Sequence, residues 1–182
     1  CSALTPGKLL WIFLISKTDF SFTGMLTPYF LQKAPRGGPA AVEANDNWNL
    51  VTQQTANWSA EEAQQIVQSI IDSGESFNVI YAENDDMAKG AVAALDKANI
   101  SHGVGKDVII MGFDCNTWAL QELLNKNWNY DGQCNPYQAS KIHEIIQKLE
   151  KGETISPKVI IMEEKGFDAN EITQDDIDKY GI

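Results

Sequence analysis

The chain is poor in the residues on which most catalytic and metal centres depend. Its 182 residues include only three cysteines and two histidines, and no two cysteines form a C-x-x-C pair. That set is too small for a zinc site of the usual spacing. The glycines Gly103 and Gly105 lack the third glycine of a dinucleotide loop and precede a strand instead of following one. We therefore predict no metal and no cofactor.

Basic residues are also scarce. Lysine and arginine total 14 against 25 acidic residues, which gives a formal net charge of -11. Binding to nucleic acid phosphates requires clustered Lys and Arg, and so does binding to an anionic membrane surface. The sequence therefore predicts neither partner, whereas a neutral ligand such as a sugar is compatible with this charge.

Long apolar runs are absent. The longest, at residues 9–15, is far shorter than the roughly 20 residues that a membrane-spanning helix requires. Only Lys8 precedes it as a basic residue, so we interpret this run as a buried strand in preference to a signal-peptide core. Cys1 would suit a lipid-modified N-terminus.

From Trp48 onward the chain alternates between strand and helix patterns. This alternation predicts an α/β fold with a parallel, Rossmann-like sheet and helices on both faces. The expected strands are residues 49–55, 77–82, 107–113, 130–134 and 158–162. The expected helices are residues 59–73, 85–98, 117–126 and 136–151, the last with Ile142, Ile145, Ile146 and Leu149 facing inward.

Polar side chains follow the ends of these strands. In parallel sheets, ligands bind beyond the carboxyl ends of the strands. Carboxylates accept hydrogen bonds from hydroxyls, and amides both donate and accept, so a group of Asp, Asn and Gln suits a sugar. Trp58 is placed to cover the apolar face of the sugar ring. The polar candidates are Asn84, Asp85, Asp86, Asp114, Asn116, Gln133 and Asn135.

Each of these residues also has a purely structural interpretation. One of Asn84, Asp85 and Asp86, with Asp85 or Asp86 favoured, would serve as the N-cap of a helix, and Asn116 as the cap of the next one. Trp58 would be a core aromatic, and Gln133 and Asn135 would be turn residues. What favours a binding site is the convergence of these residues on one edge of the predicted sheet.

Three segments carry a resemblance to a known family. Residues 82–91 (AENDDMAKGA), 108–114 (VIIMGFD) and 133–136 (QCNP) resemble the C-terminal half of periplasmic sugar-binding proteins, the ribose- and galactose-type receptors of ABC importers. The last segment is most similar to the galactofuranose-binding subgroup. The resemblance covers about residues 36–165.

The resemblance implies one lobe of a type I periplasmic binding protein. Such a receptor closes two lobes on a pentose or hexose and delivers it to an ABC transporter permease at the periplasmic or extracellular face of the membrane. By position, Asn84, Asp114 and Gln133 match the hydroxyl ligands of the family's C-terminal lobe. Trp58 matches the stacking ring, Arg36 matches a cleft arginine if one gap is allowed, and Asn135 competes with Gln133.

The resemblance does not extend to the start of the chain. We expect residues 1–35 to be an atypical segment, truncated or foreign to the family, and residues 36–182 to be the sugar-binding lobe. A single lobe supplies half a cleft, so it would bind sugar weakly, and its exposed cleft face could drive formation of a homo-dimer.

Two other functions are compatible with parts of this pattern. The effector-binding domain of a LacI-type transcription regulator shares this fold. Because nothing in residues 1–47 supplies a basic helix-turn-helix, this alternative requires a regulator that lacks its DNA-binding head. A hydrolase using Asp85, Asp86 and Asp114 with a metal would also place carboxylates here. No nucleophile stands with a histidine, because His102 reads as a solvated turn residue and His143 as a surface residue. We therefore predict that the chain is not an enzyme.

Two of the three cysteines are candidates for a disulfide bond. Cys115 and Cys134 follow neighbouring predicted strands, so they could meet at the sheet edge and form a disulfide.

Overall fold

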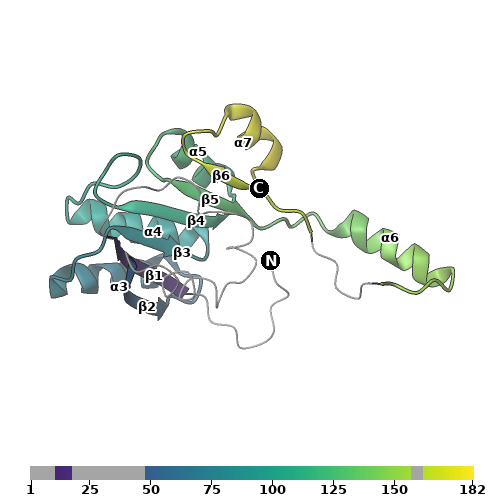
Figure 1. Cartoon of the computed structure of the whole chain (residues 1–182), viewed down its shortest axis with the longest axis horizontal. Coiled ribbons are helices and arrows are strands. Elements are labelled where there is room, and N and C mark those ends of the chain that lie inside the picture. Colours follow the sequence, from purple (N-terminus) through teal and green to yellow (C-terminus); the bar gives the residue numbers. More distant parts are fainter. Residues whose placement is uncertain (1–10, 18–47, 157–161) are drawn as a thin grey trace.

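The computed structural model describes residues 11–17, 48–156 and 162–182. These residues form one six-stranded sheet in the order β2-β1-β3-β4-β5-β6, with helices packed against it (Figure 1). Most of the strand predicted at residues 158–162 lies outside the described residues. The strands are β1 (Trp11–Lys17), β2 (Trp48–Thr55), β3 (Val79–Ala82), β4 (Ile109–Asp114), β5 (Tyr130–Gln133) and β6 (Gly166–Asp168). The helices are α3 (Ala60–Ser73), α4 (Asp85–Lys97), α5 (Thr117–Leu124), α6 (Ala139–Glu150) and α7 (Gln174–Tyr180).

The centre of the sheet is parallel. β3 pairs with β4, and β4 with β5, each in parallel register, through the α4 and α5 crossovers. β1 runs antiparallel to both of its neighbours, β2 and β3, and β6 runs antiparallel to β5. The predicted α/β class, a mostly parallel sheet flanked by helices, is thus confirmed, with antiparallel strands added beside its parallel centre.

β1 lies within residues 1–35, the segment that we expect from the sequence to be atypical for the lobe. The apolar run does form a strand, shifted slightly toward the C-terminus of the predicted position, and it lies inside the same sheet between β2 and β3. The domain boundary at residue 35 stays a prediction.

Helix boundaries in the centre of the chain follow local capping chemistry. The Ser59 side chain accepts a hydrogen bond from the Glu62 backbone N–H at 3.2 Å, which begins α3. Gly74 ends that helix in the left-handed conformation at φ 77°, where a side chain would be strained. Serine and glycine are residue types that commonly begin and end helices. Ser59 and Glu62 also have the spacing of a capping box, but only half of it forms, because the Glu62 carboxylate accepts from Asn57.

The core lies mainly on one face of the sheet. Ile80 and Ile110 project from the central strands into a cluster that includes apolar side chains of α3, α4, α5 and α7. The alternate residues of the same strands, such as Val79 and Ile109, form a second cluster on the opposite face. Since both faces of β3 and β4 are buried, the strands read as continuous apolar runs, as buried parallel strands do.

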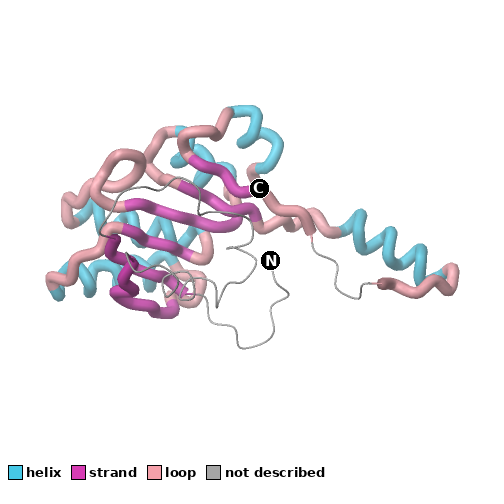
Figure 2. Tube along the Cα trace, viewed as in Figure 1, coloured by secondary structure: helices cyan, strands magenta, loops and turns pink. Residues whose placement is uncertain are grey.

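α6 does not pack as predicted. It extends away from the sheet (Figure 2), and none of its residues is buried. Ile142, Ile146 and Leu149 are about half exposed, at 51%, 47% and 56%. The apolar stripe on this helix is real, but a stripe does not specify the surface that covers it. The helix also begins at Ala139 and not at Pro136. Across the described residues, no helix combines the length and apolar character needed to cross a bilayer.

Candidate functional site

The sheet topology brings four strand ends to one edge. β3, β4 and β5 are parallel, and β2 points the same way as β3 because β1 is antiparallel to both. The segments that follow these strands therefore all emerge at the same edge, which we call the binding edge. It carries every predicted site residue within the described ranges. Arg36 lies outside the described residues.

Asn84 links β3 to α4. Its side chain is buried, and its Oδ1 accepts a hydrogen bond from the Met87 backbone N–H at 2.9 Å. Asn84 is therefore the N-cap of α4. Of the three predicted candidates it is the one that takes this role, and the preference for Asp85 or Asp86 is wrong. The cap fixes the Asn84 side chain while leaving its amide group, a donor, available by its chemistry for a ligand.

Asp85 is a further residue of this edge. It is completely buried at the first position of α4. Its Oδ2 accepts two hydrogen bonds from Asn116, from the backbone N–H at 2.8 Å and from the side-chain Nδ2 at 3.0 Å. Because its Nδ2 is engaged there, Asn116 stands at the N-cap position of α5 without a side-chain capping bond. Asp85 thus ties the start of α4 to the turn that follows β4.

That turn has an unusual backbone. Asp114 has φ 141° and Cys115 has φ 67°, both in the region that residues with a Cβ rarely adopt. Such conformations persist where surrounding contacts impose them, and they gather at ligand sites. The Asp85–Asn116 hydrogen bonds are contacts of that kind. The turn therefore presents Asp114 in a geometry that the chain alone would not favour.

The pKa of the Asp114 carboxyl is shifted as well. Burial, followed by the negative charge of Asp85, raises the pKa of Asp114 to about 7. A hydrogen bond between the Asp85 backbone and Asp114 acts in the opposite direction but is outweighed. Near neutral pH, Asp114 can therefore either accept a hydrogen bond as a carboxylate or donate one as an acid.

Asp131, in β5, was missed by the sequence analysis. It is completely buried, and neither of its carboxyl oxygens has a hydrogen-bond partner. Burial and the charge of Asp85 raise the pKa of Asp131 well above its ordinary value. The only signal in the sequence is a charged residue inside a short strand, and on its own that signal suggests an exposed position.

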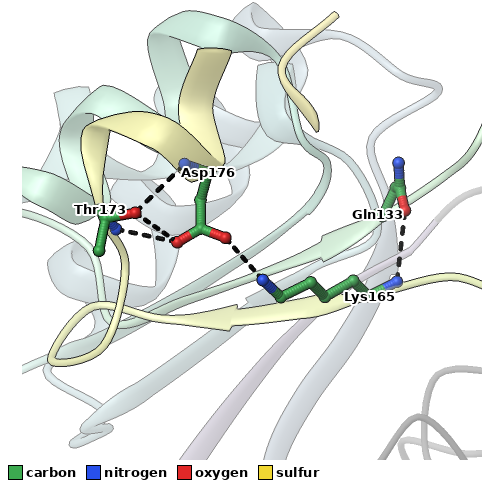
Figure 3. Close-up of polar contacts among 4 residues, drawn as sticks. All are labelled: Gln133, Lys165, Thr173 and Asp176. Carbon is green, nitrogen blue, oxygen red and sulfur yellow. Dashed lines mark hydrogen bonds and ion pairs between the residues drawn. The ribbon is translucent and has the colours of Figure 1, made fainter. Parts of the chain in front are cut away.

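Gln133 ends β5 and faces Lys165 (Figure 3). The Gln133 backbone N–H donates a hydrogen bond to the Lys165 carbonyl oxygen at 2.8 Å. In return, the Lys165 backbone N–H donates to the Gln133 side-chain Oε1 at 3.3 Å. The Lys165 ammonium in turn lies 2.6 Å from Asp176, which holds the pKa of Asp176 below its usual range. Gln133 is thereby anchored through Lys165 to α7, another link that spacing in the sequence did not indicate.

Asn135 has a local structural role. Its Oδ1 accepts from the Tyr137 N–H at 2.9 Å, and its own N–H donates to Glu164 at 3.1 Å. This is the turn bonding that Asn side chains commonly provide. Of the two competing candidates, Gln133 is the one buried at the strand end, and Asn135 is occupied in shaping the loop.

Trp58 lies at the same edge but farther along it. The side chain is 43% exposed, so its interpretation as a core aromatic is wrong, and its backbone has φ 67°. Because β1 separates β2 from β3, two strand spacings, about 10 Å, separate the strand before Trp58 from the strand before Asn84. Asn84, Asp114 and Gln133 stand at the ends of three adjacent strands, whereas Trp58 stands apart from them.

Two further expectations are corrected by the structure. Cys115 is a free, buried thiol, which excludes the Cys115–Cys134 disulfide, and burial raises the pKa of this thiol. His102 is not a solvated turn residue: Nδ1 lies 3.0 Å from Asn127 O, and Nε2 lies 3.0 Å from Asp96 Oδ1. In the described part of the chain, no group of three or more His, Cys, Asp or Glu is arranged to hold a metal ion.

Comparison with known proteins places this chain among binding proteins. Residues 31–154 match the family described as "Periplasmic binding protein domain". The fructose import binding protein FruE of Bifidobacterium longum is 30% identical over 150 residues, 77% of this chain and 44% of the relative. The galactofuranose-binding protein YtfQ of Escherichia coli is 22% identical over 129 residues, 69% of this chain and 40% of the relative. The chain spans less than half the length of these relatives.

Solved structures agree on the fold. A Mycobacterium smegmatis protein in complex with β-D-fucofuranose is 26% identical, with a TM-score of 0.66 over 74% of this chain and 43% of that protein. A galactofuranose binding protein gives a TM-score of 0.70 over 80% of this chain and 49% of that protein. At 20% identity, the second likeness concerns the fold alone.

Proposed function

Because this chain belongs to the periplasmic binding protein family, we propose that it supplies one wall of a sugar-binding site in the receptor of an ABC importer. The relatives reported above are sugar import or sugar-binding proteins, which favours a sugar as the ligand. The same relatives are named as binding proteins and not as enzymes, which is consistent with a receptor that releases its ligand unchanged.

The observation that carries the proposal is the alignment of Asn84, Asp114 and Gln133. Asn84 lies just beyond β3, and Asp114 and Gln133 are the last residues of β4 and β5, so the three side chains stand at the ends of adjacent parallel strands along one edge. Neighbouring strands lie about 4.8 Å apart, so side chains at adjacent strand ends can contact different hydroxyls of one small sugar. Two amides and one carboxyl provide both donors and acceptors for those hydroxyls.

Each of these side chains is fixed by contacts within the protein. Asn84 caps α4, Asp114 stands on the turn fixed by Asp85, and Gln133 is bound through Lys165. Ordering polar groups before the ligand arrives lowers the entropic cost of binding. This support favours Asn84, Asp114 and Gln133 as the ligand set, with Trp58 as an additional contact from farther along the binding edge. Arg36 is a further proposed contact on the family resemblance alone.

The remaining parts of the proposal concern the intact receptor. A second lobe would close over the binding edge, and the closed form would dock on a permease in the membrane. Cys1, if it follows a signal sequence in the intact protein, would accept a lipid anchor. Without an opposing wall, the binding edge would bind sugar weakly, and it could pair with a second copy of the chain.

The direct test is a titration of the chain with neutral sugars followed by backbone NMR, which detects millimolar binding. The panel contains fructose, ribose, galactose and fucose, in which furanose and pyranose rings are both represented. We expect shifts confined to Asn84, Asp114, Gln133 and their neighbours. Asn84→Ala and Asp114→Ala should abolish these shifts.

Asp86→Ala is the matched control. Asp86 lies one residue beyond Asp85 in the same helical turn, but its side chain is exposed. Its removal should leave the titration unchanged. If no sugar shifts the binding edge, or if Asp86→Ala abolishes binding as completely as Asp114→Ala does, the proposed site is wrong.

A further inference from the structure

We propose that the buried carboxyls of Asp85 and Asp131 share one proton, and that Asp85 is the positioning residue that holds the 114–116 turn at the binding edge. The second half rests on the proposed function, because it assigns a task to that turn. The first half concerns the folded chain alone and stands without a ligand.

The two carboxyls are brought together across β4. Asp131 pairs in register with Gly112 on the neighbouring strand, so a side chain at either position would project on the same face of the sheet. At Gly112 there is no side chain, and a Cβ built there would lie 2.7 Å from Asp85 Oδ1. The Asp85 carboxyl therefore occupies the space above Gly112, beside Asp131.

A shared proton accounts for atoms that otherwise have no partner. Both residues are completely buried, and Asp85 Oδ1 and both oxygens of Asp131 receive no hydrogen bond. Two ionised carboxylates in this setting would repel each other and lack solvation. One proton removes a charge and creates a donor. Burial raises the pKa of both carboxyls, and the hydrogen bond that a shared proton allows between them would add to this rise at Asp131 and oppose it at Asp85.

The surroundings place that proton on Asp131. Asp85 Oδ2 accepts two hydrogen bonds from Asn116, and Asp85 stands at the N-terminus of α4, where the helix dipole favours negative charge. At Asp131, a contact with the Cys115 backbone favours the charged form, but burial and the charge of Asp85 outweigh it. The other titratable groups facing the pair are also acidic: Asp114 and Cys115 after β4, with Glu164 beyond them. Among the described residues, neither Asp85 nor Asp131 forms an ion pair.

Asp85 then connects this proton to the binding edge. Its Oδ2 holds Asn116, and the two residues before Asn116 have backbone conformations that require external support. Loss of the shared proton would leave two adjacent charges, and their repulsion would displace Asp85 from Asn116. The turn carrying Asp114 would loosen as a result, so ligand affinity should fall when the pair loses its proton.

The proton is tested by carbon-13 NMR of the whole chain with labelled aspartate side-chain carboxyls, titrated from about pH 4 to about pH 9. We expect the Asp131 carboxyl carbon to keep the shift of a protonated acid at neutral pH while Asp85 is ionised. In Asp131→Asn, whose amide replaces the shared proton, Asp85 should stay ionised to lower pH. An Asp131 carbon with the shift of a carboxylate at neutral pH would overturn the proposal.

The positioning role is tested by hydrogen exchange of the Asn116 amide. Asp85→Ala should speed that exchange at least about tenfold, as loss of a hydrogen bond to a charged acceptor predicts. Amides in the middle of α5 should be unaffected, and the Asp86→Ala control should change neither. Equal exchange of Asn116 in the wild type and in Asp85→Ala would overturn the role. Neither readout involves sugar, so failure of the proposed function would be seen separately.

Discussion

Asp85 lies so close to Gly112 that a single added carbon would collide with it. A Cβ on Gly112 would be 2.7 Å from Asp85 Oδ1 and 2.8 Å from the Trp128 ring. Real Cβ atoms essentially never come this close to another atom, so glycine at this position is what allows a carboxyl to be buried beneath the binding edge. The site and the core therefore depend on the same residue.

Gly112→Ala should destabilise the chain by about 1–3 kcal/mol, the usual cost of overpacking a core. Urea unfolding gives this value directly. Combined with Asp85→Ala, which removes one of the two colliding groups, the substitution should cost less than the sum of the single changes. Strict additivity would show that the two residues do not compete for this space.

Gly90→Ala offers a test in which two effects have opposite signs. Glycine within a helix is less favourable than alanine by about 1 kcal/mol, so propensity alone predicts stabilisation. A Cβ here, however, would overlap the Ala60 carbonyl oxygen at the start of α3. We expect the collision to dominate and thermal unfolding to occur at a lower temperature. A rise in Tm would mean that α3 and α4 pack less closely than described.

Substitutions at Asn84 should separate capping from ligand binding. Asn84→Ala removes the hydrogen bond to the Met87 N–H and should cost about 1 kcal/mol, whereas serine, an equally good N-cap, should retain most of that stability. Both variants lack the amide and should bind sugar less well. The capping role is refuted if chemical denaturation finds alanine and serine equally destabilising.

The stability of the chain should depend on pH through Asp114. Because the pKa of Asp114 in the folded chain is raised to about 7, the folded form retains a proton that the unfolded form releases near pH 4. The contribution of this group is therefore greatest below about pH 4 and is lost as the pH rises toward about 7. Asp114→Asn should gain stability relative to the wild type across this interval. If the urea midpoints of the wild type and of Asp114→Asn differ by the same amount at every pH, the raised pKa of Asp114 is contradicted.

The apolar face of α6 should tolerate charge. Ile146 is 47% exposed on a helix that extends from the body of the protein, so Ile146→Lys should change the free energy of unfolding by no more than about 0.5 kcal/mol. Ile110, fully buried, provides the contrast: Ile110→Ala should cost about 2–5 kcal/mol. A large loss of stability in Ile146→Lys would show that this face is covered.

Local signals were sufficient to predict the centre of the fold. Ser59 and Gly74 delimit α3 through hydrogen bonding and a positive φ, both of which depend on neighbouring residues only. The apolar run at β4 indicated a strand buried on both faces, and the alternation of elements indicated the edge where Asn84, Asp114 and Gln133 emerge. These features are determined by residues close in sequence.

The features that sequence reasoning missed depend on contacts between distant residues. The Asp85 carboxyl is buried beside Asp131 because Gly112, which lies on another strand, leaves room for it. His102 is held by Asn127, which the sequence places far along the chain. The stripe on α6 predicted an apolar face correctly, but its packing partner could not be derived from periodicity. In each case the deciding contact is made by a residue outside the local pattern.

The position of β1 has a consequence for how the chain folds. β3, β4 and β5 are joined by single helices, so each pairing closes a short loop, whereas β1 must meet β2 across residues 18–47 and β3 across a still longer separation. Loop closure becomes more costly with length, and long-range pairings slow folding. We expect the βαβ units to form the nucleus and β1 to join last. In pulse-labelling experiments, the β1 amides should acquire protection after those of β4.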